Sequence, residues 1–94
     1  MRYIDVNWVH ESEEYPYRLI SEIGKDQFEV RKLEFFRNGN IGFASDTSNT
    51  ESTMLGIVEV PPLEEINSDK EFQGKNISKQ EFELLWEQYV PANS

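Results

Sequence analysis

The spacing of the apolar residues changes along the chain, and this change constrains the fold more than any other feature. In Arg2–His10 apolar and polar residues alternate, which is typical of a strand with one buried face. Near the other end Phe82, Leu85, Trp86 and Tyr89 recur at i, i+3, i+4 and i+7, which predicts one apolar stripe on a helix. The sequence therefore predicts an α+β fold, with an N-terminal antiparallel sheet packed by C-terminal helices.

Turns and breakers divide the first two thirds of the chain into about five expected strands. After the first strand, the segments with strand composition are 17–23, 27–37, 40–44 and 54–60. The parity of the apolar residues slips within 27–37, which predicts a β-bulge near Arg31–Lys32. The alternative is that both faces of the sheet are partly covered there. Asn38–Gly39 tolerates the positive φ values of a two-residue type I′ turn, so the flanking segments are expected to pair as a hairpin.

The last third of the chain carries helix signals. Pro62 suits a first helical turn, so a short or broken helix is expected within 62–72, and Gly74 is expected to break the pattern. Ser78 and Glu81 fit the S-x-x-E capping box, in which each side chain binds the backbone N–H of the other residue. The main helix is therefore predicted to begin after Ser78.

Length and composition predict one domain spanning 1–94 and exclude several kinds of site. Ninety-four residues suit a single folding unit. Without cysteine the chain has no disulfide and no Cys-ligated zinc or iron–sulfur centre. It also lacks an apolar run of membrane-spanning or signal-peptide length, so we expect no membrane association and a cytoplasmic location.

The net charge of −9 is placed unevenly. Residues 1–45 carry six basic and eight acidic side chains, a balance of −2, whereas residues 46–94 carry three and ten, a balance of −7. An acidic field repels phosphate backbones, which argues against nucleic-acid binding, and it favours a basic protein partner. An acidic surface that only keeps the protein soluble explains the same charge.

Three segments together resemble a known family. RYIDVNW, RKLEFFRNGNIGFAS and PPLEEI…ISKQEFELLW are similar to a small bacterial domain family without an assigned function. The resemblance extends from about Arg2 to Trp86. It implies a stand-alone or appended domain of this length, and it carries over no catalytic residue.

No group of residues predicts catalysis. His10 is the only histidine, and the glutamates that follow it lie in a polar connection, so a solvated strand end explains it better than a metal or a general base. Glu64 and Glu65 are neighbours on a predicted helix and point about 100° apart, so they do not form an acid–base pair. We therefore expect a protein that is not an enzyme and that has no metal site and no cofactor.

Two surfaces are candidates for binding. If Ile4, Val6 and Trp8 face the helix, Tyr3 and its alternate neighbours face outward and form a polar docking face. The candidate residues on that open face are Asp5, Asn7 and Arg18. Ordinary cross-strand charge pairing on a solvated face explains the same residues. The candidates in the acidic helical half are Glu64, Glu65, Asp69 and Glu71. The sequence leaves open which surface is the interface.

The absence of catalytic groups and the acidic C-terminal half favour a non-catalytic protein-binding module. Its most concrete form is an immunity-type or antitoxin-like protein that occludes a basic partner. The alternative is a small-molecule-binding regulatory domain with a pocket between helix and sheet. The identity of the partner or ligand and the oligomeric state do not follow from the sequence.

Overall fold

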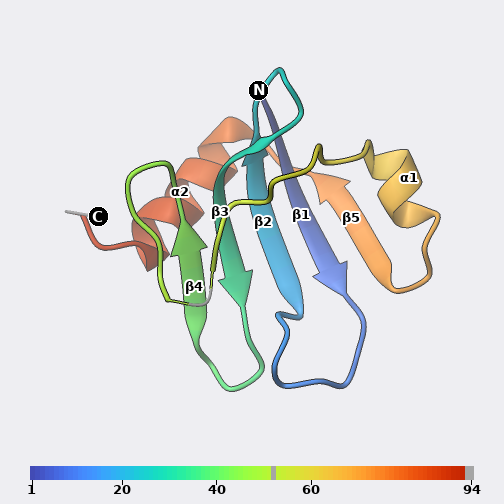
Figure 1. The fold of residues 1–94 in the computed structure, drawn as a ribbon, viewed down its shortest axis with the longest axis horizontal. Helices are drawn as coiled ribbons and strands as arrows, with labels where there is room; N and C mark the ends of the chain where they lie inside the picture. The colour runs from blue at the N-terminus through green and yellow to red at the C-terminus, as the bar shows by residue number, and fades with distance from the viewer. Residues whose placement is uncertain (52, 93–94) are drawn as a thin grey trace.

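A computed structural model describes residues 1–51 and 53–92, and within them a five-stranded antiparallel sheet lies between helices (Figure 1). The sheet order is β4-β3-β2-β1-β5. The elements are β1 (Arg2–Trp8), β2 (Arg18–Ile23), β3 (Glu29–Phe35), β4 (Ile41–Ala44), α1 (Leu63–Asn67), β5 (Phe72–Asn76) and α2 (Lys79–Tyr89). The predicted α+β fold is confirmed.

The position of the fifth strand differs from the prediction. It is not 54–60 but β5, which pairs with β1 at the edge of the sheet. Segment 54–60 has strand composition but pairs with no strand, because composition alone does not supply a neighbouring backbone. Gly74 does not break a helix; it lies in β5, where a Cβ would be 2.7 Å from Leu63 Cδ2 of α1. Glycine is therefore the residue that lets α1 cross β5 closely.

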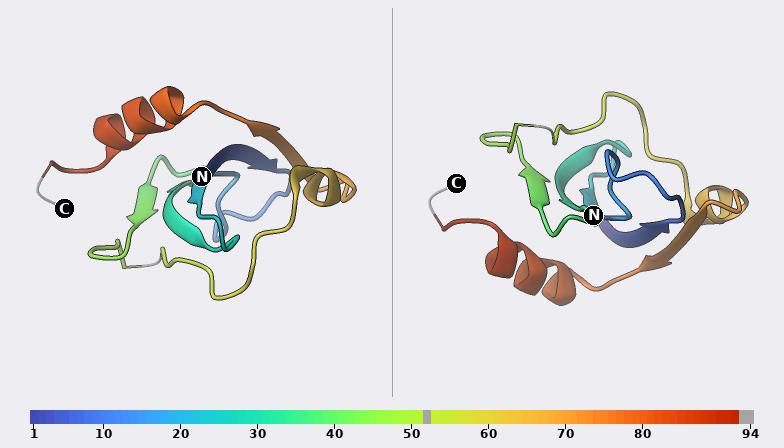
Figure 2. Two further views of the ribbon diagram at one scale, coloured as in Figure 1. Left: turned by 90° about the horizontal axis from the view of Figure 1, so that it is seen from above. Right: turned by 90° about the horizontal axis from the view of Figure 1, so that it is seen from below.

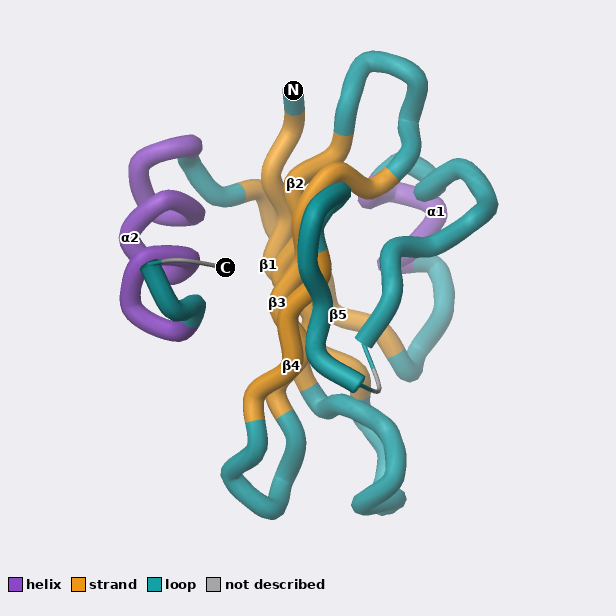
Figure 3. Tube along the Cα trace, turned by 60° about the vertical axis from the view of Figure 1, so that its left-hand side comes forward, coloured by secondary structure: helices purple, strands orange, loops and turns teal. Residues whose placement is uncertain are grey.

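Both faces of the sheet are covered, although the alternating pattern predicted only one covered face. α2 lies on one face, and α1 with segment 53–62 lies on the other (Figure 2 and Figure 3). The core on the α2 side contains Tyr3, Ile20, Leu33, Phe35, Phe43, Phe82 and Val90. The core on the α1 side contains Ile4, Val6 and Ile23.

The expected orientation of β1 is therefore wrong. Ile4 and Val6 pack beneath α1, and Tyr3 contacts the main helix, with its ring 5.3 Å from that of Phe82. The period of two separates the two sets of side chains but does not say which set faces which helix. Because side chains on both faces are covered, the open polar face that was expected on β1–β3 is not present there.

The β3–β4 hairpin forms with a loop one residue longer than predicted. Phe36 N–H donates to Asn40 C=O and Gly39 N–H donates to Phe36 C=O, each at 3.0 Å, so the loop is 37–39. Gly39 has φ +91°, whereas Asn38 does not have the positive φ that a type I′ turn requires. This is the common three-residue loop that closes with a glycine bulge.

Replacing Gly39 with valine is expected to destabilise the domain by roughly 1 kcal/mol or more, because a β-branched residue resists positive φ. A Cβ at this position would have no heavy atom of another residue within 4 Å beyond its chain neighbours, so strain in the backbone is the only cost. Urea denaturation measures it, and Asn38→Asp in the same loop is the control, since aspartate keeps the oxygen that accepts from Asn40 N–H. Equal midpoints for the two variants would contradict the assigned loop.

The predicted bulge is present, one residue earlier than expected. Glu22 pairs with Arg31, but the next residue, Ile23, pairs with Glu29, so Val30 is the extra residue. The bulge keeps Arg31 on the α2 face and turns Glu29 toward the opposite face. This change of register places Arg31 beside Glu22 and Glu29 beside Lys32, in two of the polar networks described below.

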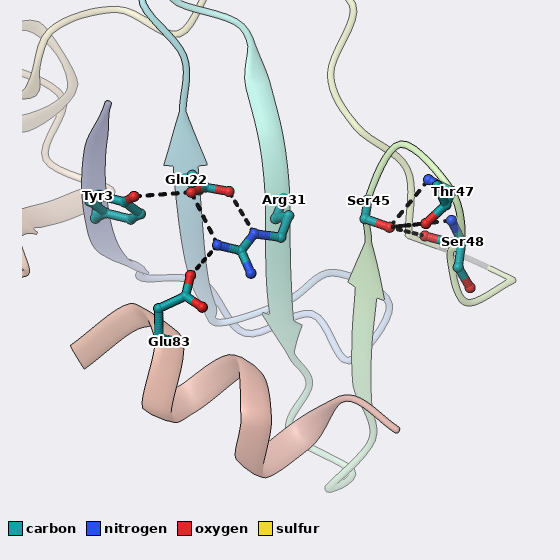
Figure 4. Close-up of polar contacts among 7 residues, drawn as sticks. All are labelled: Tyr3, Glu22, Arg31, Ser45, Thr47, Ser48 and Glu83. Carbon is teal, nitrogen blue, oxygen red and sulfur yellow. Dashed lines mark hydrogen bonds and ion pairs between the residues drawn. The ribbon is translucent and has the colours of Figure 1, made fainter. Parts of the chain in front are cut away.

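The two edge strands are partly capped by the chain itself. On β5 the carboxamide of Asn67 pairs with the backbone of Gly74, accepting from its N–H at 2.6 Å and donating to its C=O at 3.0 Å. Beside β4, Thr50 N–H donates to Phe43 C=O, and the Ser45 hydroxyl organises the turn to Ser48 (Figure 4). These contacts occupy groups that would otherwise accept another strand.

The cap of α2 agrees with the prediction. Ser78 Oγ accepts a hydrogen bond from Glu81 N–H at 3.0 Å, and Glu81 Oε1 accepts one from Ser78 N–H at 3.4 Å. Helix α2 has 11 residues. In residues 1–51 and 53–92 no helix combines the length and the apolar character that crossing a membrane requires.

Replacing Ser78 with alanine is expected to cost about 1 kcal/mol, because one N–H of the first helical turn loses its acceptor. Ser78→Thr keeps the hydroxyl and serves as the control. Thermal unfolding followed by circular dichroism measures the difference. Equal stabilities of the alanine and threonine variants would show that the cap contributes nothing.

Candidate functional site

The four acidic candidates lie on α1 and on the turn that leads into β5. Glu64 and Glu65 occupy the first turn of α1, where the positive end of the helix dipole favours carboxylates. Asp69 Oδ1 accepts a hydrogen bond from Glu71 N–H at 2.9 Å and so shapes the turn. All four side chains are exposed, and within the described chain none of them forms an ion pair. Their charges are therefore uncompensated.

The candidates on the sheet are placed differently. Arg18 donates to both carboxylate oxygens of Asp5, from Nε at 2.9 Å and from Nη2 at 2.7 Å, and Asp5 is only 6% exposed. The guanidinium also lies 5.2 Å from the ring centre of Phe35, and its hydrogen bonds to Asp5 raise the pKa of Arg18. Of this group only Asn7 is exposed. The Asp5–Arg18 pair is thus satisfied within the chain.

A second polar network joins the sheet to α2 (Figure 4). Arg31 donates to both oxygens of Glu22, at 2.6 Å and 3.1 Å, and Tyr3 OH donates to Glu22 Oε2 at 3.0 Å. Arg31 also donates to Glu83 of α2. Its guanidinium lies over the rings of Phe82 and Trp86, at 4.9 Å and 5.1 Å.

The pKa shifts of this network follow from its contacts. The hydrogen bond from Arg31 holds the pKa of Glu22 below its usual value, against the opposing effect of burial. Burial raises the pKa of the Tyr3 phenol, and the hydrogen bond to Glu22 raises it further. The hydrogen bond to Glu22 raises the pKa of Arg31. Each charge has a partner, so this network serves to hold α2 on the sheet.

A third network lies on the opposite face, beneath segment 53–56. Lys32 Nζ is 3.2 Å from Glu29 and 3.9 Å from Glu34. Thr53 Oγ1 donates to Glu34 at 2.9 Å, and Gly56 N–H donates to Glu29. These bonds fasten the segment across the sheet. No local pattern in the sequence indicates that segment 53–56 joins this network, because Thr53 and Gly56 lie 19 and 27 residues from the glutamates that they bind.

His10 is used to order the connection between β1 and β2. Its Nε2 is 2.8 Å from Pro16 C=O, and its Nδ1 accepts from Ser12 N–H at 3.1 Å. These partners select the neutral tautomer with hydrogen on Nε2. The ring also packs edge-on against Trp8, with centroids 4.6 Å apart. Across the described ranges, no three His, Cys, Asp or Glu residues are grouped so that they could hold a metal ion.

A cavity of about 380 Å³ opens between α1 and the sheet. Its apolar floor is formed by β1 and β2, and segment 60–61 and β5 enclose it. The lining consists of Ile4, Val6, Leu19, Ser21, Glu29, Val60, Pro61, Glu65, Ile66, Asp69 and Phe72. Two of the acidic candidates, Glu65 and Asp69, therefore lie at an apolar cavity. A pocket between helix and sheet belongs to the alternative that the sequence left open, but the place and lining of this cavity depend on how α1 and β5 pack on β1.

Comparison with known proteins places the chain in a family. A family model described as "Domain of unknown function (DUF6881)" matches residues 2–91. This match confirms the resemblance to a family without an assigned function that the sequence motifs predicted. No curated protein and no solved structure matches the chain.

Proposed function

The chain belongs to the DUF6881 family, a domain of unknown function, and we propose that it is a non-catalytic protein-binding module that occludes a basic site on a partner protein. An immunity protein or an antitoxin-like protein acts in this way. One observation carries the proposal. The four carboxylates of residues 63–71, which we call the α1 segment, are exposed and form no ion pair within the described chain. By contrast, Asp5 and Glu22 on the sheet are each bound by an arginine.

Occlusion would proceed by electrostatic steering followed by docking. The carboxylates of Glu64, Glu65, Asp69 and Glu71 would replace the phosphates or acidic groups that a cationic cleft otherwise binds. Attraction between exposed charges extends over about 10 Å at 0.1 M salt, so this field would raise the rate of encounter. The contribution to specificity would come from matching the charge pattern of the partner.

A small-molecule-binding regulatory domain is the second candidate, and the cavity beneath α1 favours it. At about 380 Å³ the cavity falls within the range of roughly 300–1,000 Å³ that is common for ligand sites. Native mass spectrometry of the protein purified from its own cell would distinguish the two. A retained metabolite, together with no protein partner, would support this candidate and contradict occlusion.

The occlusion proposal predicts that charge reversal on the α1 segment slows association with the partner. A protein captured from the native cell should be basic, and its association rate with the triple variant Glu64→Lys, Glu65→Lys, Glu71→Lys should fall by about tenfold or more at low salt. Stopped-flow measurements over a salt series test this. The difference between the wild type and the triple variant should shrink as salt is added.

The matched control reverses the charge of three exposed glutamates that lie outside the α1 segment. Glu11, Glu13 and Glu87 are exposed and lie outside the α1 segment, so their reversal to lysine alters net charge without altering the proposed interface. Asn7→Ala tests the sheet face. The α1 segment is not the interface if the control variant slows association as much as the triple variant of the α1 segment does. The same conclusion follows if Asn7→Ala has the larger effect.

A further inference from the structure

The cavity beneath α1 has a floor and walls that are almost entirely apolar. Ile4 and Val6 of β1 are buried at its base, and Leu19 of β2 is half-buried beside them. Ile66 of α1 and Phe72 of β5 form the wall and are also half-buried. The half-buried side chains Leu19, Ile66 and Phe72 keep apolar surface accessible, and covering it with a ligand would be favourable.

The polar groups of the cavity are not equivalent. Ser21 Oγ donates to Glu29 at 3.3 Å, and Glu29 also binds Lys32, so this carboxylate is already compensated. Glu65 and Asp69 are exposed and have no ionic partner in the part of the chain that the structure describes. The described lining includes no basic residue. The cavity therefore combines an apolar interior with negative charge at its rim.

This combination selects one ligand chemistry. An anion would be repelled by the rim, and a small hydrated cation would gain nothing from the apolar floor. A group with a long aliphatic stem and a cationic end satisfies both, because the stem can be buried while the charge stays at the surface. Arginine and lysine side chains have this form, and arginine is frequent among the residues that dominate binding interfaces.

We propose that this cavity is an anchor pocket for a basic side chain of the protein partner, with the aliphatic stem over Ile4, Val6 and Leu19 and the cation at Glu65 and Asp69. The proposal rests on the proposed function, in which a basic protein docks on the α1 segment. It adds that one side chain of the partner is inserted, so that docking combines burial of apolar surface with charge pairing.

The ligand chemistry can be tested without the partner. The probe is hexylguanidinium, and hexanol and hexanoate share its stem but not its charge. In NMR titrations of the full chain, hexylguanidinium should shift the methyl signals of Ile4, Val6 and Leu19 and bind at least about tenfold more tightly than hexanoate. Equal binding of all three compounds, or no shift at these methyls, would overturn the proposal.

Neutralising the rim provides the matched comparison. Glu65→Gln combined with Asp69→Asn keeps the size of both side chains and leaves Asp69 an oxygen that can accept from Glu71 N–H. This double variant should bind hexylguanidinium about threefold to tenfold more weakly, the range expected for two exposed charge pairs. Its affinity for hexanol should be unchanged. Glu87→Gln on α2 should have no effect. Unchanged binding of hexylguanidinium to the double variant would overturn the role of the rim.

Filling the cavity separates this proposal from the proposed function. Leu19→Trp should abolish hexylguanidinium binding and speed dissociation of the captured partner, whereas Leu84→Trp, at a position that is 60% exposed on α2, should do neither. Methyl spectra of the α2 core check that both variants fold. If Leu19→Trp leaves partner dissociation unchanged while the α1 charge reversal still slows association, the anchor pocket is wrong and the proposed function stands. If no basic protein partner exists, the assignment to a partner side chain falls with it.

Discussion

Replacing Phe82 with alanine is expected to destabilise the domain by about 3–5 kcal/mol, the usual cost of removing a buried phenylalanine. Phe82 has no exposed surface. Its ring is 5.3 Å from Tyr3 and 6.0 Å from Trp86, and the Arg31 guanidinium lies over it. The variant therefore loses contacts with two strands and with the following turn of α2. Since small domains are stable by only about 5–15 kcal/mol, a large fraction of the molecules should unfold near physiological temperature.

Urea denaturation of Phe82→Ala and of a second α2 variant provides the measurement. Leu84 lies two residues away on the same helix but is 60% exposed, so Leu84→Ala should change stability by less than about 0.5 kcal/mol. This pair separates packing against the sheet from helix propensity. Similar losses in both variants would mean that α2 is not held to the sheet by Phe82.

The helix that carries Phe82 could be predicted because its signals are local. Ser78, Glu81 and the apolar stripe all lie within residues 78–89, and the capping box forms as expected. β5 could not be predicted in this way. The strand FQGKN is mostly polar and contains a glycine, and it becomes a strand because it lies against β1 and is capped by Asn67.

The same distinction applies to the candidate sites. The acidic residues of the α1 segment are visible in the sequence, and the structure places Glu65 and Asp69 at the cavity. Cross-strand charge pairing is the alternative that the sequence left open for Asp5 and Arg18, and the structure shows this pair. The lining of the cavity depends on contacts across the sheet, which composition does not record. The period of two in β1 predicted two faces, one of them open. The structure covers both faces, and acidic residues on the α2 face, Asp5 and Glu22, form ion pairs with arginines of the sheet. Carboxylates that are free to bind a partner could therefore be distinguished from carboxylates that are paired within the chain only once the burial of each side chain was known.

Replacing Arg31 with methionine is expected to cost about 3–5 kcal/mol, because it leaves Glu22 buried without a cationic partner. Glu22 is 5% exposed, and the remaining partner is Tyr3 OH. Methionine keeps an apolar chain over Phe82 and Trp86, so the loss reports mainly on charge. Lys70→Met, an exposed position, is the control and should be nearly neutral. Adding Glu22→Gln to Arg31→Met should recover part of the loss, since the uncompensated charge is then removed.

The pH dependence of this loss gives the more specific test. In the wild type Arg31 lowers the pKa of Glu22 beneath its usual 4.5, so the stability that Glu22 contributes is complete above pH 4.5 and is lost as pH falls through the lowered value. Arg31 is the largest of the effects that lower the pKa of Glu22, so without it burial is opposed only by the Tyr3 hydrogen bond and by Lys79, and the pKa of Glu22 in the folded variant is higher than in the folded wild type. The folded variant therefore takes up its proton on Glu22 at a higher pH than the folded wild type, and the destabilisation caused by the substitution should shrink as the pH falls. Urea midpoints measured between about pH 3 and pH 7 should show the difference between wild type and variant narrowing toward acid. A difference that stays constant over this range would show that the charge of Glu22 does not depend on Arg31, and that the destabilisation comes only from lost packing.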